Sequence, residues 1–377
     1  MNFQLNDEQT HLQDSLARLL RERHGFDTRR RAAATAQGWS DEAWADLVGM
    51  GLTALVVPEA CDGLGGGAVD LYPVMVELGR ALRQEPYLES AVLGTLALAA
   101  AGDDAVRNEF LSRAASGQQR LGLARGEQGR ESHAGVSATR QGDGWLLSGT
   151  LPGVPNGADA LQLAVTVTVA DAAQAGPALF LMDSRAAGVS ARAFQRVDQS
   201  PAADLVLRDV PARLLAAPSP GTGQALERVL GVGAAALCAE ALGVAKAAMA
   251  MTVEYVKTRK QFGHALWDNQ VVRHRCAEML VALDTCESMA LLAAIAADNP
   301  GGAESRRELA QAKLLVGREG LWVCEQAVQL HGGIGMTDEY PVGHYLQRML
   351  VIGQTLGDAD ALIDFLALRV DAPFAST

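Results

Sequence analysis

The sequence predicts an α+β protein in which two helical regions flank a middle β domain. Three observations predict this class. Residues 1–118 read as short, well-capped helices, residues 119–218 as short β-rich runs, and residues 219–377 as long helices with apolar periodicity. We therefore expect an N-terminal helical domain, a middle antiparallel β-barrel or sandwich, and a C-terminal four-helix bundle, with boundaries at these residues.

The first region carries strong helix-start signals. Asn6 is placed to cap a helix that runs to about His24, and Gln9 lies three residues later, where it can reach back to the cap. Ser40 is the cap of a second helix. Beyond a glycine-rich turn at 62–67, further helices are expected over 70–82, 87–101 and 104–115.

The middle region changes to short runs separated by Gly, Pro, Asp and Asn. Strands are expected over 121–124, 145–148, 161–169, 178–182 and 203–207. Short strands at such spacing are typical of a small antiparallel barrel or sandwich.

The last region is helical, with breaks at 262–266, 299–302 and 331–335. Its most apolar stretch, 229–251, is rich in Ala and Gly and is interrupted by Glu240 and Lys246. This interruption predicts a buried helix, not a membrane span.

Composition excludes several classes of protein. A chain of 377 residues, 49% hydrophobic, is long enough for two or three domains, and its net charge of −12 argues against a nucleic-acid partner. The N-terminus has no cationic start followed by an apolar core, as a signal peptide would. The five cysteines show neither CxxC nor Cys/His ligand spacing. We expect a cytoplasmic protein with no metal site, no disulfide framework and no membrane partner.

Motifs in the first region resemble those of the acyl-CoA dehydrogenase family. The segments 44–47, 51–52, 57–59, 63–65 and 77–79 are similar to the family pattern W..L...G.....PE..GG.G......E.G. The spacing holds over more than thirty residues, and the helix–β–helix order agrees with it.

Two segments of the last region extend the resemblance. Residues 255–263 are similar to the family's Y...R..FG, with Gln270 in the place of its loop glutamine, and residues 327–341 are similar to Q..GG.G...EYP. The resemblance implies that these segments grip the adenosine and pyrophosphate end of an FAD bound mainly by a neighbouring subunit. The cofactor residues so implied are Arg259, Gln261, Phe262, Gln270, Gln329, Gly332 and Gly333.

Elementary chemistry agrees with this use. Arg259 offers a permanently charged, forked partner for phosphate, and Phe262 offers a flat apolar contact. The pair Gly332-Gly333 would let backbone N–H groups approach a phosphate without side chains in the way.

The middle region departs from the family pattern. The family binds the flavin ring with a Thr/Ser-rich stretch and a later W.T.G, but the matching places here are 123–131 and 153–157, which contain neither a hydroxyl side chain nor a tryptophan. This leaves open backbone donors, or a partner chain, for the ring.

The catalytic base is displaced as well. The family's glutamate position corresponds to Leu356 or Gly357, and the neighbouring carboxylates Asp358 and Asp360 are candidate substitutes. A third candidate is Glu240, which lies seven residues after Gly233, the position where some branches carry the base, and shares its helix face. Burial would raise the pKa of the Glu240 carboxyl and suit it to take a proton. The alternatives are a carboxylate paired with an arginine across a helix interface, or an exposed one.

Other charged and titratable residues receive ordinary interpretations. His331 and His344 are expected to be hydrogen-bonding spacers, and the run Arg29-Arg30-Arg31 a solvated helix face.

The resemblance implies an enzyme that oxidises an acyl-CoA to the 2,3-enoyl-CoA. A carboxylate removes the α-proton, the β-hydrogen leaves as hydride to flavin N5, and electrons pass to an electron-transfer flavoprotein. The branch it resembles acts on bulky or sterol-type acyl chains. The assembly would be a homotetramer or an α2β2 heterotetramer with a paralogous subunit. Two alternatives remain: a half-site or non-catalytic subunit of such a heterotetramer, and a flavin oxidase or monooxygenase on the same fold.

Overall fold

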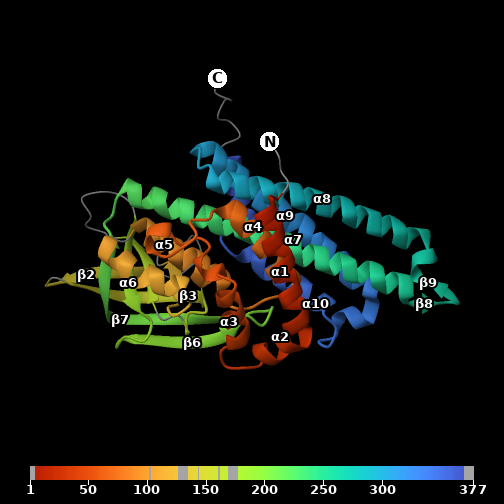
Figure 1. Cartoon of the computed structure of the whole chain (residues 1–377), viewed down its shortest axis with the longest axis horizontal. Coiled ribbons are helices and arrows are strands. Elements are labelled where there is room, and N and C mark those ends of the chain that lie inside the picture. Colours follow the sequence, from red (N-terminus) through yellow and green to blue (C-terminus); the bar gives the residue numbers. More distant parts are fainter. Residues whose placement is uncertain are drawn as a thin grey trace, which may run out of the picture. The chain divides into compact units, whose positions relative to one another are not determined.

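The computed structural model describes residues 5–101, 103–125, 135–142, 144–159, 162–168 and 177–368 (Figure 1). The expected α+β order of helices, sheet and helices is confirmed. Packing divides the chain into two compact units, one of residues 1–30, 68–83 and 234–377 and one of residues 31–67 and 84–233. The three domain boundaries expected from sequence remain a prediction.

The sheet belongs to the second unit. Its strands are β1 (Leu121–Arg125), β2 (Gly135–Gln141), β3 (Gly144–Pro155), β4 (Gln162–Thr168), β5 (Pro177–Asp183), β6 (Val189–Gln195) and β7 (Pro201–Ala216). They run in the order β1-β4-β5-β7-β3-β2, with β6 also paired to β7. The long strand β7 thus joins two groups of strands, and alternate side chains such as Leu147, Phe180 and Leu205 form the buried core between them.

Most strand pairs are antiparallel, as expected, but β1 pairs with β4 in parallel. The β2–β3 hairpin stands between these two strands in the chain, which supplies the long connection that parallel neighbours need. All five predicted strands lie within observed ones, as far as the structure describes them. Strands β2 and β6 were missed; their side chains are largely exposed, and their apolar residues are mostly small, which makes the alternation weak.

Helical segments of the second unit pack through short polar contacts. They are α3 (Asp41–Gly49), the 3-10 turns Leu52–Ala54 and Glu59–Cys61, the π-helical segment η3 (Tyr87–Gly94), α5 (Thr95–Ala101) and α6 (Asp104–Ala115). The Tyr87 hydroxyl donates to the Leu52 carbonyl at 3.0 Å, and the Thr53 hydroxyl to the Ala115 carbonyl at 2.7 Å. Segment η3 lies directly on β1, since a Cβ at Gly94 would stand 2.7 Å from the backbone nitrogen of Gly122.

The first unit is helical. It contains α1 (Asp7–Arg23), α4 (Ala68–Arg80), most of α7 (Pro220–Thr258), α8 (Gln270–Asp298), α9 (Ala303–His331), α10 (Val342–Gln354) and α11 (Ala359–Ala367), and helix α2 (Phe26–Ala33) begins in it. The predicted capping box is confirmed, with the Gln9 backbone N–H donating to the Asn6 side chain at 2.8 Å and the Asn6 N–H to the Gln9 side chain at 3.1 Å. The three predicted breaks in the last region are confirmed too.

Helices α4 and α7 touch backbone to backbone. A Cβ at Gly79 would lie 2.2 Å from the carbonyl oxygen of Glu240, and one at Gly243 would lie 2.0 Å from that of Val76. Only residues without a side chain permit this approach. The crossing holds the middle of α7 in place.

Helices α7 and α8 are long and apolar enough to cross a membrane by length and composition alone. The core helix of a water-soluble protein passes the same test, so this is weak evidence for a span. In α7 72% of the most apolar window is buried inside the protein, as expected for a core helix, against 44% in α8.

The arginine run on α2 corrects one interpretation. Arg29 is 2% exposed, donating from Nε to the Leu82 carbonyl at 3.1 Å and from Nη1 to His344 Nδ1 at 3.1 Å. The prediction of a solvated face is therefore wrong for Arg29, although Arg31 is exposed. A guanidinium can be buried where carbonyl and imidazole acceptors meet it, and these acceptors come from the turn after α4 and from α10.

Candidate cofactor clasp and catalytic carboxylates

The first cofactor segment is a small hairpin that follows α7. Strand β8 (Lys260–Gln261) pairs with β9 (His264–Ala265), and the two turn residues Phe262 and Gly263 have positive φ of 52° and 87°. Such angles fit a two-residue hairpin of type I′. The Phe262 side chain is 96% exposed. The ring is therefore accessible to a ligand or to another subunit.

Polar groups flank this ring. The backbone of Arg259 is tied down, since its N–H donates to the Tyr255 carbonyl at 2.8 Å and its carbonyl accepts from Leu266. Its guanidinium is exposed and makes no ion pair among the residues that the structure describes. Gln261 and Gln270 are exposed too, Gln270 as the first residue of α8.

The second cofactor segment is the turn at the end of α9. Gly332, with φ of 65°, ends the helix, and a short 3-10 turn runs from Gly332 to Met336. Gly332 and Gly333 are exposed, and a Cβ built at either meets nothing within 4 Å. The backbone here is open to an incoming group, as phosphate binding requires. Gln329, one turn earlier, is exposed.

The structure brings the two segments together at one end of the helices. The Tyr255 ring stacks on His331 with centroids 4.4 Å apart, and its hydroxyl donates to the His331 carbonyl at 3.3 Å. Tyr255 lies one turn before Arg259, and His331 directly precedes Gly332. Tyr340 completes the cluster, with its ring centroid 5.1 Å from that of His331.

His331 leaves one buried acceptor in this cluster. Its Nδ1 lies 2.7 Å from the Ala327 carbonyl and donates to it, and burial lowers the pKa of the ring, so the ring stays neutral. Its Nε2 is buried with no hydrogen-bond partner among the described residues. A cofactor hydroxyl or amino group could satisfy this nitrogen. The open glycines, the exposed ring and the orphaned nitrogen all fit the nucleotide end of FAD.

The Glu240 carboxylate is paired with an arginine. It is 4% exposed, and its Oε1 accepts from Arg348 Nε on α10 at 2.7 Å, in a pair whose side chains are 5% and 13% exposed. This is the arrangement foreseen as the alternative to catalysis. The Arg348 partner had no local sequence signal, because it lies 108 residues away.

Asp358 has a local structural task. Its Oδ1 accepts from the Ala361 N–H at 2.8 Å and caps α11. The loop before it turns through Leu356 and Gly357, with φ of 59° and 109°. The Gly357 carbonyl accepts from Lys313 Nζ at 2.6 Å. At the family's glutamate position the chain therefore presents a strained backbone turn.

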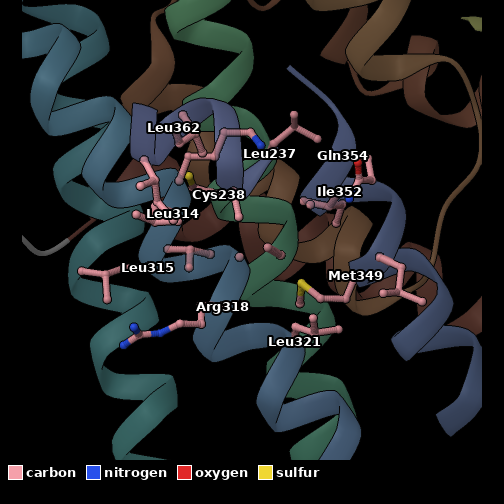
Figure 2. A pocket seen from close by; sticks show the side chains of 18 residues that line it. Leu237, Cys238, Leu314, Leu315, Arg318, Leu321, Met349, Ile352, Gln354 and Leu362 are labelled. Atoms are coloured by element: carbon pink, nitrogen blue, oxygen red, sulfur yellow. The ribbon is translucent and has the colours of Figure 1, made fainter. Parts of the chain in front are cut away.

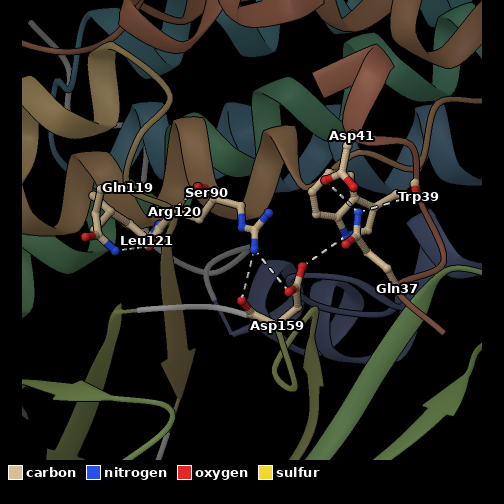
Figure 3. A network of polar contacts seen from close by, with 8 residues as sticks. All are labelled: Gln37, Trp39, Asp41, Ser90, Gln119, Arg120, Leu121 and Asp159. Carbon is tan, nitrogen blue, oxygen red and sulfur yellow. Dashed lines mark hydrogen bonds and ion pairs between the residues drawn. The ribbon is translucent and has the colours of Figure 1, made fainter. Parts of the chain in front are cut away.

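In the second unit, the two segments expected to face the flavin ring lie near Arg120 and Asp159, which belong to the polar network drawn in Figure 3. Arg120 Nη2 pairs with Asp159 Oδ1 at 3.0 Å, and Trp39 Nε1 donates to Asp159 Oδ2 at 3.2 Å. The Arg120 guanidinium lies 4.8 Å from the Trp39 ring centroid. Arg120 Nε, in contrast, is buried with no hydrogen-bond partner among the described residues. Residues 126–131 lie outside the described part of the chain.

The described ends of those segments do not fit a flavin ring as the family binds it. Within 121–125 and 153–157 no side chain carries a hydroxyl. Ser90, which lies beside them, accepts from the Leu121 N–H at 3.0 Å. The hydroxyl donors with which the family meets the polar edge of a flavin are therefore missing, and the side-chain donors in these stretches are those of Arg125 and Asn156.

No group of three or more potential metal ligands occurs within the described residues.

Comparison with known proteins agrees with this geometry. A family model described as "Acyl-CoA dehydrogenase, N-terminal domain" matches residues 6–118, and one described as "Acyl-CoA dehydrogenase, C-terminal domain" matches residues 220–370. The probable acyl-CoA dehydrogenase YngJ of Bacillus subtilis is 28% identical over 329 residues, which are 83% of this chain and 86% of that protein.

Two solved structures resemble the whole chain. One is a variant of the steroid ACAD Tcur3481-Tcur3483, 32% identical with a TM-score of 0.86 over 96% of this chain and 97% of that one. The other is the ChsE4-ChsE5 complex from Mycobacterium tuberculosis, 25% identical with a TM-score of 0.87 over 98% of both chains.

Proposed function

Because the chain belongs to the acyl-CoA dehydrogenase family, we propose that it is a subunit of an FAD-dependent enzyme that oxidises an acyl-CoA to the 2,3-enoyl-CoA. The observation that carries the proposal is the meeting of the α7 and α9 ends through Tyr255 and His331. This meeting places Arg259 and Phe262 at the same end of the helices as Gly332-Gly333.

In this proposal the chain holds the nucleotide end of the cofactor. The Arg259 guanidinium binds a phosphate oxygen, the Phe262 ring covers an apolar face, and the side-chain-free Gly332-Gly333 turn lets the pyrophosphate approach, although the Gly332 N–H itself donates to carbonyls of α9. Bound FAD supplies the hydride acceptor for the β-hydrogen of the substrate. The electron acceptor we propose is an electron-transfer flavoprotein, and the setting is the cytoplasm.

A homomeric and a heteromeric version differ in the source of the catalytic base and of the ring-binding donors. In the homomeric version Glu240 removes the α-proton, which requires its release from Arg348. In the heteromeric version a paralogous subunit supplies both parts, and this chain completes the cofactor site from across an interface. The Glu240–Arg348 pair and the absence of hydroxyl side chains in 121–125 and 153–157 favour the heteromeric version.

The two similar structures point the same way. One is the complex of ChsE4 and ChsE5, and the other is the steroid ACAD Tcur3481-Tcur3483. By this likeness we propose a bulky, steroid-type acyl chain as the substrate class.

The visible spectrum of the purified chain tests these versions. A yellow chain that an acyl-CoA bleaches under nitrogen, with bleaching lost in Glu240→Gln while FAD stays bound, supports the homomeric version. A colourless chain that becomes yellow and active only with a paralogous subunit supports the heteromeric one. Failure to bind FAD or oxidise acyl-CoA in either form contradicts the proposal, and rapid peroxide formation in air replaces it with an oxidase.

A pair of glycine variants tests the clasp itself. We expect Gly333→Val to weaken FAD binding by at least about tenfold, roughly 1.4 kcal/mol, because the new side chain stands where phosphate must approach. Folding should be unaffected, since the added Cβ meets nothing within 4 Å. The matched control is Gly335→Val, whose Cβ would lie 2.9 Å from the Val328 carbonyl and should lower stability instead. Unchanged FAD affinity in Gly333→Val, measured by fluorescence titration in the assembled enzyme, would contradict this placement.

A further inference from the structure

A second site lies far from the cofactor clasp, in the middle of the helices of the first unit. A cavity of about 350 Å³ opens there between α7, α9, α10 and α11 (Figure 2). This volume is at the lower end of the range for small-molecule sites. On α7 the cavity reaches Ala241, which lies about 27 Å along the helix axis from Arg259.

The walls are almost entirely apolar. Side chains of Leu237, Leu314, Leu321, Met349 and Leu362, one or more from each helix, point toward one another in Figure 2. Cys238 adds a thiol, and burial raises the pKa of that thiol to about 12, so it stays uncharged. Such a lining binds a hydrocarbon body and gives no hold to a polar one.

One buried side chain in this apolar lining, that of Lys313, carries a basic group. Lys313 is 6% exposed, lines the cavity, and its Nζ makes one hydrogen bond among the described residues, to the Gly357 carbonyl at 2.6 Å. An ammonium has three donors, so a single carbonyl leaves the group incompletely satisfied. Burying a cation in this way is unfavourable unless an acceptor or an anion meets it.

The other charged groups around Lys313 define what could meet it. Burial lowers the pKa of Lys313, and the nearby Asp358 carboxylate acts in the opposite direction. Asp358 is already the cap of α11. Arg318 also lines the cavity, but it pairs with Glu319 at 2.8 Å and its side chain is 73% exposed. Lys313 is therefore the cation that a buried ligand would reach.

We infer that this cavity binds a medium-length hydrocarbon chain that ends in a carboxylate, with the chain between the four helices and the carboxylate on Lys313. A carboxylate accepts charge-assisted hydrogen bonds from the ammonium, which a neutral head group of the same length does not. The cavity shares no residue with the cofactor clasp, although Gly357, which accepts from Lys313, lies at the position of the family's catalytic glutamate.

Calorimetric titration of the full chain with dodecanoate, dodecan-1-ol and butanoate tests the inference. We expect saturable binding of dodecanoate near one per chain, at least about tenfold weaker binding of the alcohol, and no measurable binding of butanoate, which lacks the apolar area. The measurement needs neither FAD nor turnover, so its failure and a failure of the proposed function are distinguishable. Absence of dodecanoate binding overturns the inference.

Three variants locate the ligand. Lys313→Met keeps a side chain of similar length without the charge, and it should remove the preference for dodecanoate over the alcohol. The matched control Arg318→Met should leave that preference unchanged. Gly317→Leu should weaken both ligands, because Gly317 lines the cavity and a Cβ there enters open space.

Two results would count against the inference. Retention of the preference in Lys313→Met, or its loss in Arg318→Met, would show that Lys313 does not hold the carboxylate. A change of oligomer mass in Gly317→Leu, in a parent chain that binds no dodecanoate, would show that another subunit covers the cavity.

Discussion

At the scale of single residues, long-range partners set what each charged group can do. Glu240 looked like a general base in a dry helix, but Arg348 meets its carboxylate at 2.7 Å. Arg29 looked like part of a solvated run, but it is buried and donates hydrogen bonds to the Leu82 carbonyl and to His344. In both cases the deciding atoms lie far away in the sequence.

The Glu240–Arg348 pair makes a stability prediction. Arg348→Met should lower the free energy of unfolding by about 3–5 kcal/mol, because it leaves a buried carboxylate without its cation. The double variant Glu240→Leu with Arg348→Met should recover most of this loss, since no buried charge remains. Urea denaturation of the three proteins measures both effects. A single variant within about 1 kcal/mol of the parent would show that the pair is not buried as described.

At the scale of elements, helix and strand positions followed local signals where one face was buried. The caps at Asn6 and Ser40 and the strands of the core carried such signals. The edge strands β2 and β6 have largely exposed side chains, and the sequence did not predict them. The sequence also did not predict that α4 and α7 pack closely, because a glycine in a helix does not indicate which helix packs against it.

That crossing predicts a contrast between glycines. Gly79→Ala and Gly243→Ala should each cost about 1–3 kcal/mol or more, because the new methyl would stand 2.2 Å and 2.0 Å from a backbone oxygen of the other helix. Gly317→Ala on α9 should instead be neutral or stabilise by up to about 1 kcal/mol, since its Cβ meets nothing within 4 Å. Thermal unfolding midpoints compare the three. Equal effects at all three positions would refute a close crossing.

At the scale of the whole molecule, a partner would bind to the side chains and turns that stay exposed after each unit has folded. The Phe262 ring and the Gly332-Gly333 turn remain exposed in the described part of the chain. In the proposed function, a cofactor or another subunit covers them.

The cysteines give a prediction for the folded chain as a whole. All five are free and buried, and burial raises the pKa of Cys286, as of Cys238, to about 12. The native protein should therefore show no fast reaction with Ellman's reagent at pH 8, whereas five thiols should react in guanidinium chloride. Fast labelling of the native chain would mean that a buried thiol becomes accessible by opening of a unit.

The sequence by itself determined the fold class and the main helices and strands, and it predicted the two cofactor segments, because capping residues, apolar period and motif spacing are properties of neighbours along the chain. Tertiary structure alone decided that the ends of α7 and α9 meet, that Glu240 is paired, and that Lys313 lies at an apolar cavity. Each of these depends on atoms brought together from distant positions, where burial and charge act through space and leave no local pattern.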